Sequence, residues 1–170
     1  ISNSVLAYRA GTSPRPVMGR ELRGATLGVI GYGQIGRSVC DLGLALGMRV
    51  LVADPHAQVT NPALEPSSLE TLLAASDHVV CLAPALPSTE NLMDTRRFAQ
   101  MKRGATFVNA ARGNLVDEAA LLAALREARP TTSIFFSPVT TPLSPKAMAA
   151  RNKLVDVAER LLPESGGSLF

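Results

Sequence analysis

Short apolar runs alternate along this chain with longer segments in which apolar residues recur every three or four positions. Short continuous runs are typical of strands buried on both faces, and the longer spacing is typical of helices that cover them. The pattern predicts strands within 25–31, 48–54, 77–84, 105–110 and 133–138. Because strands that alternate with helices form parallel sheets, we expect an α/β fold with a doubly wound parallel sheet flanked by helices.

The predicted helices differ in how clearly the sequence marks them. The first ends at Gly47 and carries one apolar stripe at helical spacing, formed by Ile35, Val39, Leu42 and Leu46. Ser67 with Glu70 makes a capping-box pattern at the start of the second. Three more helices are predicted over 95–104, 117–128 and 144–162.

The composition is that of a compact domain and excludes several classes of protein. With 46% hydrophobic and 18% charged residues among 170, the chain is too apolar to be disordered and long enough for one core. The net charge of +3 comes with scattered arginines, without the basic stripe that nucleic-acid binding requires. Without a bilayer-spanning run or a signal peptide, we expect a cytoplasmic protein and no membrane partner. Cys40 and Cys81 lack metal or redox spacing, so we expect buried thiols and no metal.

A glycine-rich turn follows the first predicted strand. Its sequence, GYGQIG, places Gly31, Gly33 and Gly36 in the G-x-G-x-x-G pattern between a strand and a helix. The first glycine permits a tight turn, the second lets a pyrophosphate approach the backbone, and the third lets helix and strand pack closely. The motif predicts a Rossmann-type dinucleotide site; the alternative is a turn that binds no ligand. The intervening residues are included in that site: Tyr32, Gln34 and Ile35.

A carboxylate ends the second predicted strand. Asp54 lies where an acidic residue accepts hydrogen bonds from the adenosine ribose, and its charge would repel the 2′-phosphate of NADP. The position favours NAD as the cofactor, with the adjoining Pro55 in the same site. The alternative is an aspartate in a surface turn, and the neighbouring His56 weakens the preference for NAD.

Two prolines stiffen the segment after the third strand, APALPSTEN. Pro84 and Pro87 hold the chain extended, so it neither continues the strand nor begins a helix. We expect this segment to line the nicotinamide side of the cofactor site, with Thr89 as a hydroxyl donor. Thr89 is equally typical of a helix N-cap.

An arginine follows the fourth strand, in NAARGNLVDEAALLAAL. Arg112 stands at the carboxyl edge of the predicted sheet, where α/β proteins bind ligands. Its planar guanidinium fits a carboxylate, so we expect it to bind a substrate acid, with Ala110 and Ala111 among the cofactor contacts. The alternative is an ion pair with Asp117 or Glu118.

Together these motifs resemble the NAD-binding domain of the D-isomer-specific 2-hydroxyacid dehydrogenases. The resemblance runs from about Met18 to Glu127 and rests on GRELRGATLGVIGYGQIG, ADP and VNAARGNLVDEAAL in this order. It implies an oxidoreductase that moves a hydride between NAD and C2 of a small D-2-hydroxy or 2-oxo acid. It also implies a homodimer that pairs through this domain.

The resemblance divides the chain into three parts. Residues 1–23 correspond to a connecting segment and loop, and 24–136 to the dinucleotide-binding domain. Residues 137–170 are expected to form a segment and helix that in the family return toward the substrate domain. That substrate domain is largely absent from this chain, which begins without Met, so we expect an incomplete copy.

Two catalytic groups of the family have no counterpart in this sequence. Val139 stands where the family has its acid/base histidine, and Pro142 where it has a glycine. The segment that carries the family's glutamate is missing between Arg129 and Thr131. His56 and His78 lie elsewhere in the predicted fold. Three hypotheses remain: an incomplete dehydrogenase, an inactive NAD-binding regulatory or interaction module, or an oxidoreductase with another acid.

Overall fold

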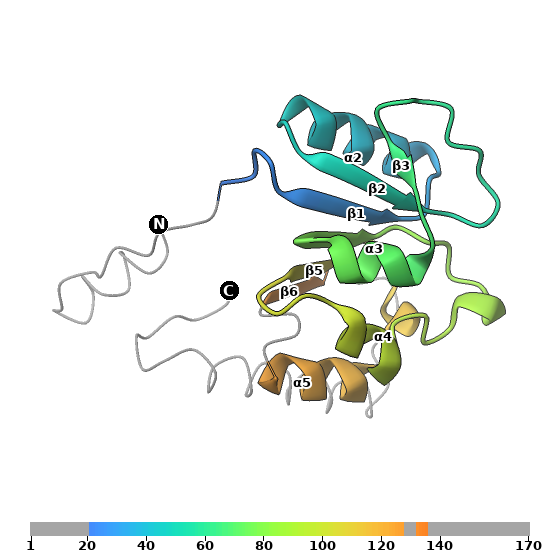
Figure 1. Cartoon of the computed structure of the whole chain (residues 1–170). Coiled ribbons are helices and arrows are strands. Elements are labelled where there is room, and N and C mark those ends of the chain that lie inside the picture. Colours follow the sequence, from blue (N-terminus) through green and yellow to red (C-terminus); the bar gives the residue numbers. More distant parts are fainter. Residues whose placement is uncertain (1–20, 128–131, 136–170) are drawn as a thin grey trace, which may run out of the picture. The chain divides into compact units, whose positions relative to one another are not determined.

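The computed structural model describes residues 21–127 and 132–135, with side chains over 21–127. Within these ranges six parallel strands form one sheet in the order β3-β2-β1-β4-β5-β6 (Figure 1). The order reverses between β1 and β4, as in dinucleotide-binding folds, and the predicted doubly wound α/β fold is confirmed. The strands are β1 (Thr26–Ile30), β2 (Arg49–Ala53), β3 (Glu65–Pro66), β4 (His78–Cys81), β5 (Thr106–Asn109) and β6 (Thr132–Phe135).

Helices cover both faces of the sheet. Helix α2 lies on one face and contacts β1 and β2, whereas α3 contacts the same strands from the other face (Figure 1). Helices α4 and α5 follow α3 on that second face. Their bounds are α2 (Gln34–Ala45), α3 (Leu69–Ala75), α4 (Thr95–Gln100) and α5 (Glu118–Arg126), with short 3-10 turns η1 (Pro87–Thr89) and η2 (Gly113–Leu115). None of these helices is long and apolar enough to cross a bilayer.

Successive residues of β1 point to opposite faces of the sheet. Leu27 and Val29 point toward α2, where a Cβ on Gly43 would lie 2.7 Å from Leu27 Cδ2. Gly28 points the other way, and a Cβ there would come within 2.5 Å of Leu72 Cδ2 in α3. Small residues at these two positions therefore let both helices approach the central strand closely.

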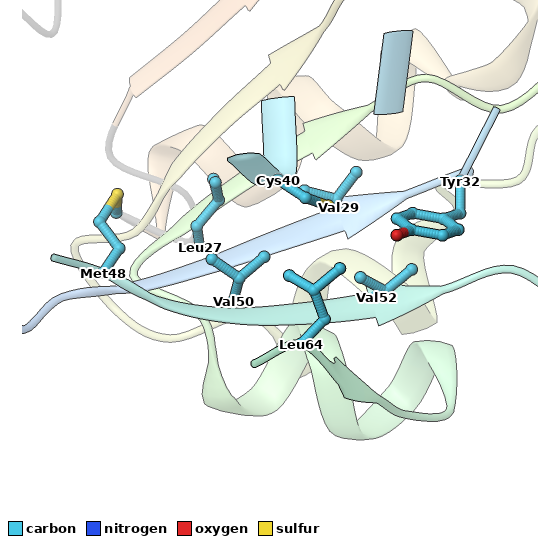
Figure 2. Close-up of a cluster of buried hydrophobic side chains, with 8 residues drawn as sticks. All are labelled: Leu27, Val29, Tyr32, Cys40, Met48, Val50, Val52 and Leu64. Atoms are coloured by element: carbon cyan, nitrogen blue, oxygen red, sulfur yellow. The ribbon is translucent and has the colours of Figure 1, made fainter. Parts of the chain in front are cut away.

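The core between α2 and the sheet is a single apolar cluster (Figure 2). The thiols of Cys40 and Cys81 are both buried and free, as predicted, and burial raises the pKa of each to about 11. On the other face, the rings of Phe98 and Phe107 meet edge to face with centroids 5.4 Å apart. The cluster beneath α2 consists of Leu27, Val29, Tyr32, Cys40, Met48, Val50, Val52 and Leu64.

Helix α2 is where predicted, but three of the four residues of its apolar stripe are exposed, and only Val39 packs against the core cluster. Ile35, Leu42 and Leu46 are 66%, 64% and 50% exposed, and Val39 is half-buried. The buried positions of α2 are instead Gly36, Cys40 and Gly43. The helical spacing predicted the helix correctly, but it does not mark the buried face, because close packing on β1 selects small residues there.

Two local features differ from the prediction, and a third prediction lies outside the described residues. No strand was predicted within 61–66, but Glu65–Pro66 form β3, which pairs with Leu51 and Val52. The cap of α3 is Ser68, not Ser67, because the Ser68 hydroxyl accepts a 3.1 Å bond from the Thr71 N–H. The predicted helix over 144–162, and the C-terminal segment that contains it, lie outside the described residues.

Asp77 ties three strands together at the amino edge of the sheet. Its carboxylate accepts bonds from the Thr26 N–H at 2.9 Å and from Lys102 Nζ at 3.0 Å. Its backbone N–H donates to the Thr26 carbonyl, and its carbonyl accepts from the Thr106 N–H. Burial pushes the pKa of Asp77 upward, but these bonds to the Thr26 N–H and Lys102 outweigh it and lower the pKa overall.

We expect Asp77→Asn to lower the free energy of unfolding by about 1 kcal/mol at neutral pH. The extra stability of wild type over Asp77→Asn is fully present above the pKa of an aspartate in the unfolded chain, about 3.9. It is lost as the pH falls through the lower pKa of Asp77 in the folded chain. Urea unfolding of both proteins from pH 7 to pH 2 measures it. Asp41→Asn, at an exposed position of α2, controls for net charge. A difference between wild type and Asp77→Asn that stayed constant down to pH 2 would contradict this account.

Candidate dinucleotide and acid site

The predicted site residues gather at the carboxyl edge of the sheet. Ile30 pairs with Ala53 on one side and with Cys81 on the other, and Cys81 pairs with Asn109. Four strands therefore end at the same level, and the segments that follow them leave the sheet side by side. In order across the edge these segments begin at Asp54, Gly31, Leu82 and Ala110. Neighbouring strands lie about 4.8 Å apart, so this row spans about 14 Å.

The predicted glycine turn is confirmed as the connection from β1 to α2. Gly31 has φ +97°, and a Cβ there would meet the Leu82–Ala83 backbone at 2.9 Å. A Cβ on Gly36 would collide with the Gly31 carbonyl oxygen. These two glycines are required by close contact inside the chain itself.

Gly33 differs from its neighbours in the motif because nothing in the described chain crowds it. A Cβ at Gly33 would meet no atom within 4 Å, and its φ of −73° suits any residue. Gly33 is the N-cap of α2 and offers no side-chain acceptor to the first N–H groups of the helix, which have no acceptor within the helix either. A helix start with open space and unsatisfied donors fits the pyrophosphate of a dinucleotide.

The carboxylate of Asp54 is held rigidly next to this turn. Its oxygens accept backbone bonds from Tyr32 at 2.7 Å, His56 at 2.8 Å and Ala57 at 3.1 Å. Burial pushes the pKa of Asp54 upward, but these three N–H donors outweigh it and lower the pKa overall. Asp54 is therefore an ionised acceptor at neutral pH, and its negative charge lies at the β2 end of the row.

Tyr32 and Arg37 support the Asp54 side of the turn. The Tyr32 side chain was predicted among the cofactor contacts, but it is 7% exposed and packs into the cluster with Val52 and Leu64 (Figure 2). Its backbone N–H is the donor to Asp54. The Arg37 guanidinium lies 4.9 Å from the centre of the Tyr32 ring, a cation–π contact that the sequence did not suggest.

The proline segment is closed by a side-chain bond from Thr89. The Thr89 hydroxyl donates to the Pro84 carbonyl at 2.6 Å and accepts from the Leu86 N–H at 2.8 Å. Thr89 is the last residue of η1, whose N-cap is Leu86, and the N-cap of α4 is Asp94, so the N-cap alternative is wrong. The single hydroxyl proton of Thr89 is already used in its bond to the Pro84 carbonyl. To donate to a cofactor, as predicted, the hydroxyl would have to give up that bond.

Arg112 projects from a short turn after β5. Its side chain is exposed, and Nη1 donates to the Ala111 carbonyl at 3.0 Å. No ion pair joins it to Asp117 or Glu118 within residues 21–127, and Asp117 instead caps α5 through Ala119 and Ala120. The alternative of a local ion pair is therefore wrong, and the remaining guanidinium N–H groups can meet an anion.

The turn also holds a residue that the sequence analysis missed. Asn109 is the last residue of β5, is 1% exposed, and bonds to both Ala111 and Arg112. A polar side chain at the end of an otherwise apolar run was the signal available for it.

The described histidines lie away from the Arg112 turn. His56 is exposed after β2, and His78 begins β4 at the amino edge. Val139, Pro142 and the segment between Arg129 and Thr131 lie outside the described residues. Residues 21–127 and 132–135 also contain no group of three or more His, Cys, Asp or Glu that could hold a metal ion. The described part of the site thus combines an open helix start, a carboxylate fixed by backbone bonds and an exposed arginine, and it contains no histidine near Arg112.

Comparison with known proteins agrees with this geometry. Residues 2–134 match the family model described as the D-isomer specific 2-hydroxyacid dehydrogenase, NAD binding domain. The chain is 43% identical over 107 residues to glycerate dehydrogenase of Methylorubrum extorquens, covering 63% of this chain and 32% of that protein. It is 44% identical over 110 residues to D-3-phosphoglycerate dehydrogenase of Haemophilus influenzae, covering 64% and 27%. The chain thus spans about a third of the length of these relatives.

Solved structures give the same result for the fold. The chain is similar to D-lactate dehydrogenase with NAD+ from Lactobacillus jensenii, with a TM-score of 0.75, 28% identity and coverage of 91% of this chain and 51% of that one. It is also similar to the NAD-complexed D-isomer specific 2-hydroxyacid dehydrogenase from Lactobacillus delbrueckii, with a TM-score of 0.75 and 27% identity. That match covers 88% of this chain and 50% of the other. The chain therefore belongs to the D-isomer-specific 2-hydroxyacid dehydrogenase family and carries that family's NAD-binding domain.

Proposed function

We propose that this chain functions as an NAD-dependent oxidoreductase that acts on a small D-2-hydroxy acid or the matching 2-oxo acid. The observation that carries the proposal is the exposed guanidinium of Arg112, without an ion-pair partner in the described chain and on the same sheet edge as the glycine turn. NAD, when bound, accepts the hydride from C2 of the hydroxy acid or returns it to the oxo acid.

The residues of the edge divide this task between two ends. Asp54 and the start of α2 hold the adenosine ribose and the pyrophosphate, because one is a fixed acceptor and the other a set of N–H donors. The predicted contacts Pro84, Ala110 and Ala111 follow β4 and β5, on the side of the nicotinamide. Arg112 binds the carboxylate of the acid and so fixes the position of C2.

A second candidate is an NAD-binding regulatory or interaction module without catalysis. Val139, at the position where family members carry their acid/base histidine, favours it, because reduction of an oxo acid needs a proton donor. An oxidoreductase whose acid lies elsewhere would combine the same binding site with activity. Turnover separates the non-catalytic module from both oxidoreductases, since all three candidates bind NAD.

We also propose that the chain forms a homodimer. Family resemblance supports pairing through this domain, and the outward apolar side chains of α2 give it surface to bury. A cytoplasmic location and the absence of nucleic-acid or membrane partners stay predictions from composition.

Replacing Gly33 tests the cofactor site without disturbing the fold. We expect Gly33→Ala to leave the melting temperature unchanged, because its Cβ meets no protein atom. The same methyl group would crowd the pyrophosphate at a cost of about 1–3 kcal/mol, and so weaken NADH binding about 5- to 150-fold. Fluorescence titration with NADH measures the affinity. Gly113→Ala, also in open space, is the matched control, and equal affinity in both variants would refute the assignment.

Replacing Arg112 tests the acid site. We expect Arg112→Gln to lower kcat/KM for a 2-oxo acid about 100-fold, the loss of a charged bond worth about 3 kcal/mol, with NADH affinity retained. NADH absorbance with a panel of small 2-oxo acids gives the rates. Arg103→Gln, an exposed arginine at the amino edge of β5, should behave as wild type. NADH binding by wild type without turnover of any acid would favour the non-catalytic module.

Sedimentation equilibrium of the wild-type chain tests the dimer. We expect a mass twice that of the chain at micromolar concentration. A single species at the monomer mass across the concentration range would rule out pairing through this domain alone.

A further inference from the structure

Asn109 is a buried polar residue in a layer of apolar ones. Of the described residues, only Thr26, Ser76 and Asn109 are buried and polar, and Asn109 is the one at the carboxyl edge. An amide in such a place lowers stability unless its donors and acceptors are bonded. Its partners therefore indicate what the side chain does.

Both ends of the Asn109 amide bond to the turn that carries Arg112. Oδ1 accepts from the Ala111 N–H at 3.1 Å, and Nδ2 donates to the Arg112 carbonyl at 2.7 Å. The planar amide of Asn109 thus bonds to two successive residues of the turn, Ala111 and Arg112. The Leu115 N–H also donates to the Arg112 carbonyl, at 3.3 Å, where η2 begins.

The base of this clamp is itself fixed by the sheet. Asn109 pairs with Cys81 of β4 on one side and with Phe135 of β6 on the other. The Ala110 N–H adds a 3.1 Å bond to the Cys81 carbonyl. The Asn109 side chain therefore links the Ala111–Arg112 backbone directly to three paired strands, in addition to the main chain itself.

We propose that Asn109 is a positioning residue for Arg112. The inference rests on the proposed function, in which Arg112 binds the substrate carboxylate. Arg112 is exposed, and its Nη1 bond to the Ala111 carbonyl depends on how that peptide is oriented. Because Asn109 holds the Ala111 N–H and the Arg112 carbonyl, it sets the direction in which the guanidinium leaves the turn. An arginine on a loose turn would sample several directions and bind an acid less well.

Two substitutions at Asn109 separate its two bonds. Asn109→Ala removes both, whereas Asn109→Asp keeps an acceptor for the Ala111 N–H but loses the donor to the Arg112 carbonyl. Asn61→Ala is the matched control, since Asn61 accepts a bond of the same kind from the Ala63 N–H in a distant loop. All variants are made in the full 170-residue chain.

Nuclear magnetic resonance of these proteins tests the positioning without any reaction. We expect slow exchange of the Ala111 amide in wild type and in Asn109→Asp, and fast exchange in Asn109→Ala. The Arg112 Nε–Hε signal, assigned by its loss in Arg112→Lys, should shift in both variants at position 109 and stay in place in Asn61→Ala. An unmoved Arg112 signal in Asn109→Ala would overturn the proposal, and Asn109→Asp decides if the alanine variant does not fold.

Kinetics then tests the consequence for the acid. We expect Asn109→Ala to lower kcat/KM for the 2-oxo acid about 100-fold, mainly through KM, with NADH affinity unchanged. Equal losses of NADH and acid binding would indicate a merely structural role and overturn the proposal. If wild type binds NADH but turns over no acid, the proposed dehydrogenase function fails, and the Arg112 signal still decides whether Asn109 positions that side chain.

Discussion

The close contact between Gly36 and the Gly31 carbonyl is the constraint on which the rest of the site depends. It brings the start of α2 against the end of β1, because no side chain separates the helix from the strand. Gly43 extends the same approach along the helix to Leu27. With α2 held there, its unsatisfied N–H groups face the carboxyl edge of the sheet, where Asp54 is also held.

The charges of the site follow the strand order. The β2 end is negative, because three backbone donors keep Asp54 ionised. The start of α2, next to it, is positive through the helix dipole and its free donors. Two strands further along, Arg112 adds a full positive charge after β5. A fixed acceptor, free N–H donors and a cation thus follow one another along the edge, which is the order in which NAD and an acid would present a ribose, a pyrophosphate and a carboxylate.

Several features were predictable because they depend on local pattern. The strands, the glycine turn and the positions of Asp54 and Arg112 follow from apolar runs and the residues just after them. The outward face of α2, the cap at Ser68 and the pairing of Glu65–Pro66 did not, because each depends on packing or on a neighbouring strand. The Thr89 hydroxyl shows the same limit, since its hydrogen bond to the Pro84 carbonyl depends on how the loop folds.

The sequence alone therefore determined the fold class, the dinucleotide motif and the arginine that defines the candidate acid site. These depend on residue type and spacing, which a linear chain records directly. The tertiary structure decided which groups are free to bind and which are already bonded. It left Gly33 in open space, gave Arg112 no ion-pair partner among the described residues, and made Asn109 a clamp on the turn. The reason is physical: hydrogen bonding and close contact are properties of atoms brought together from different elements, and the sheet edge exists only after the strands have paired.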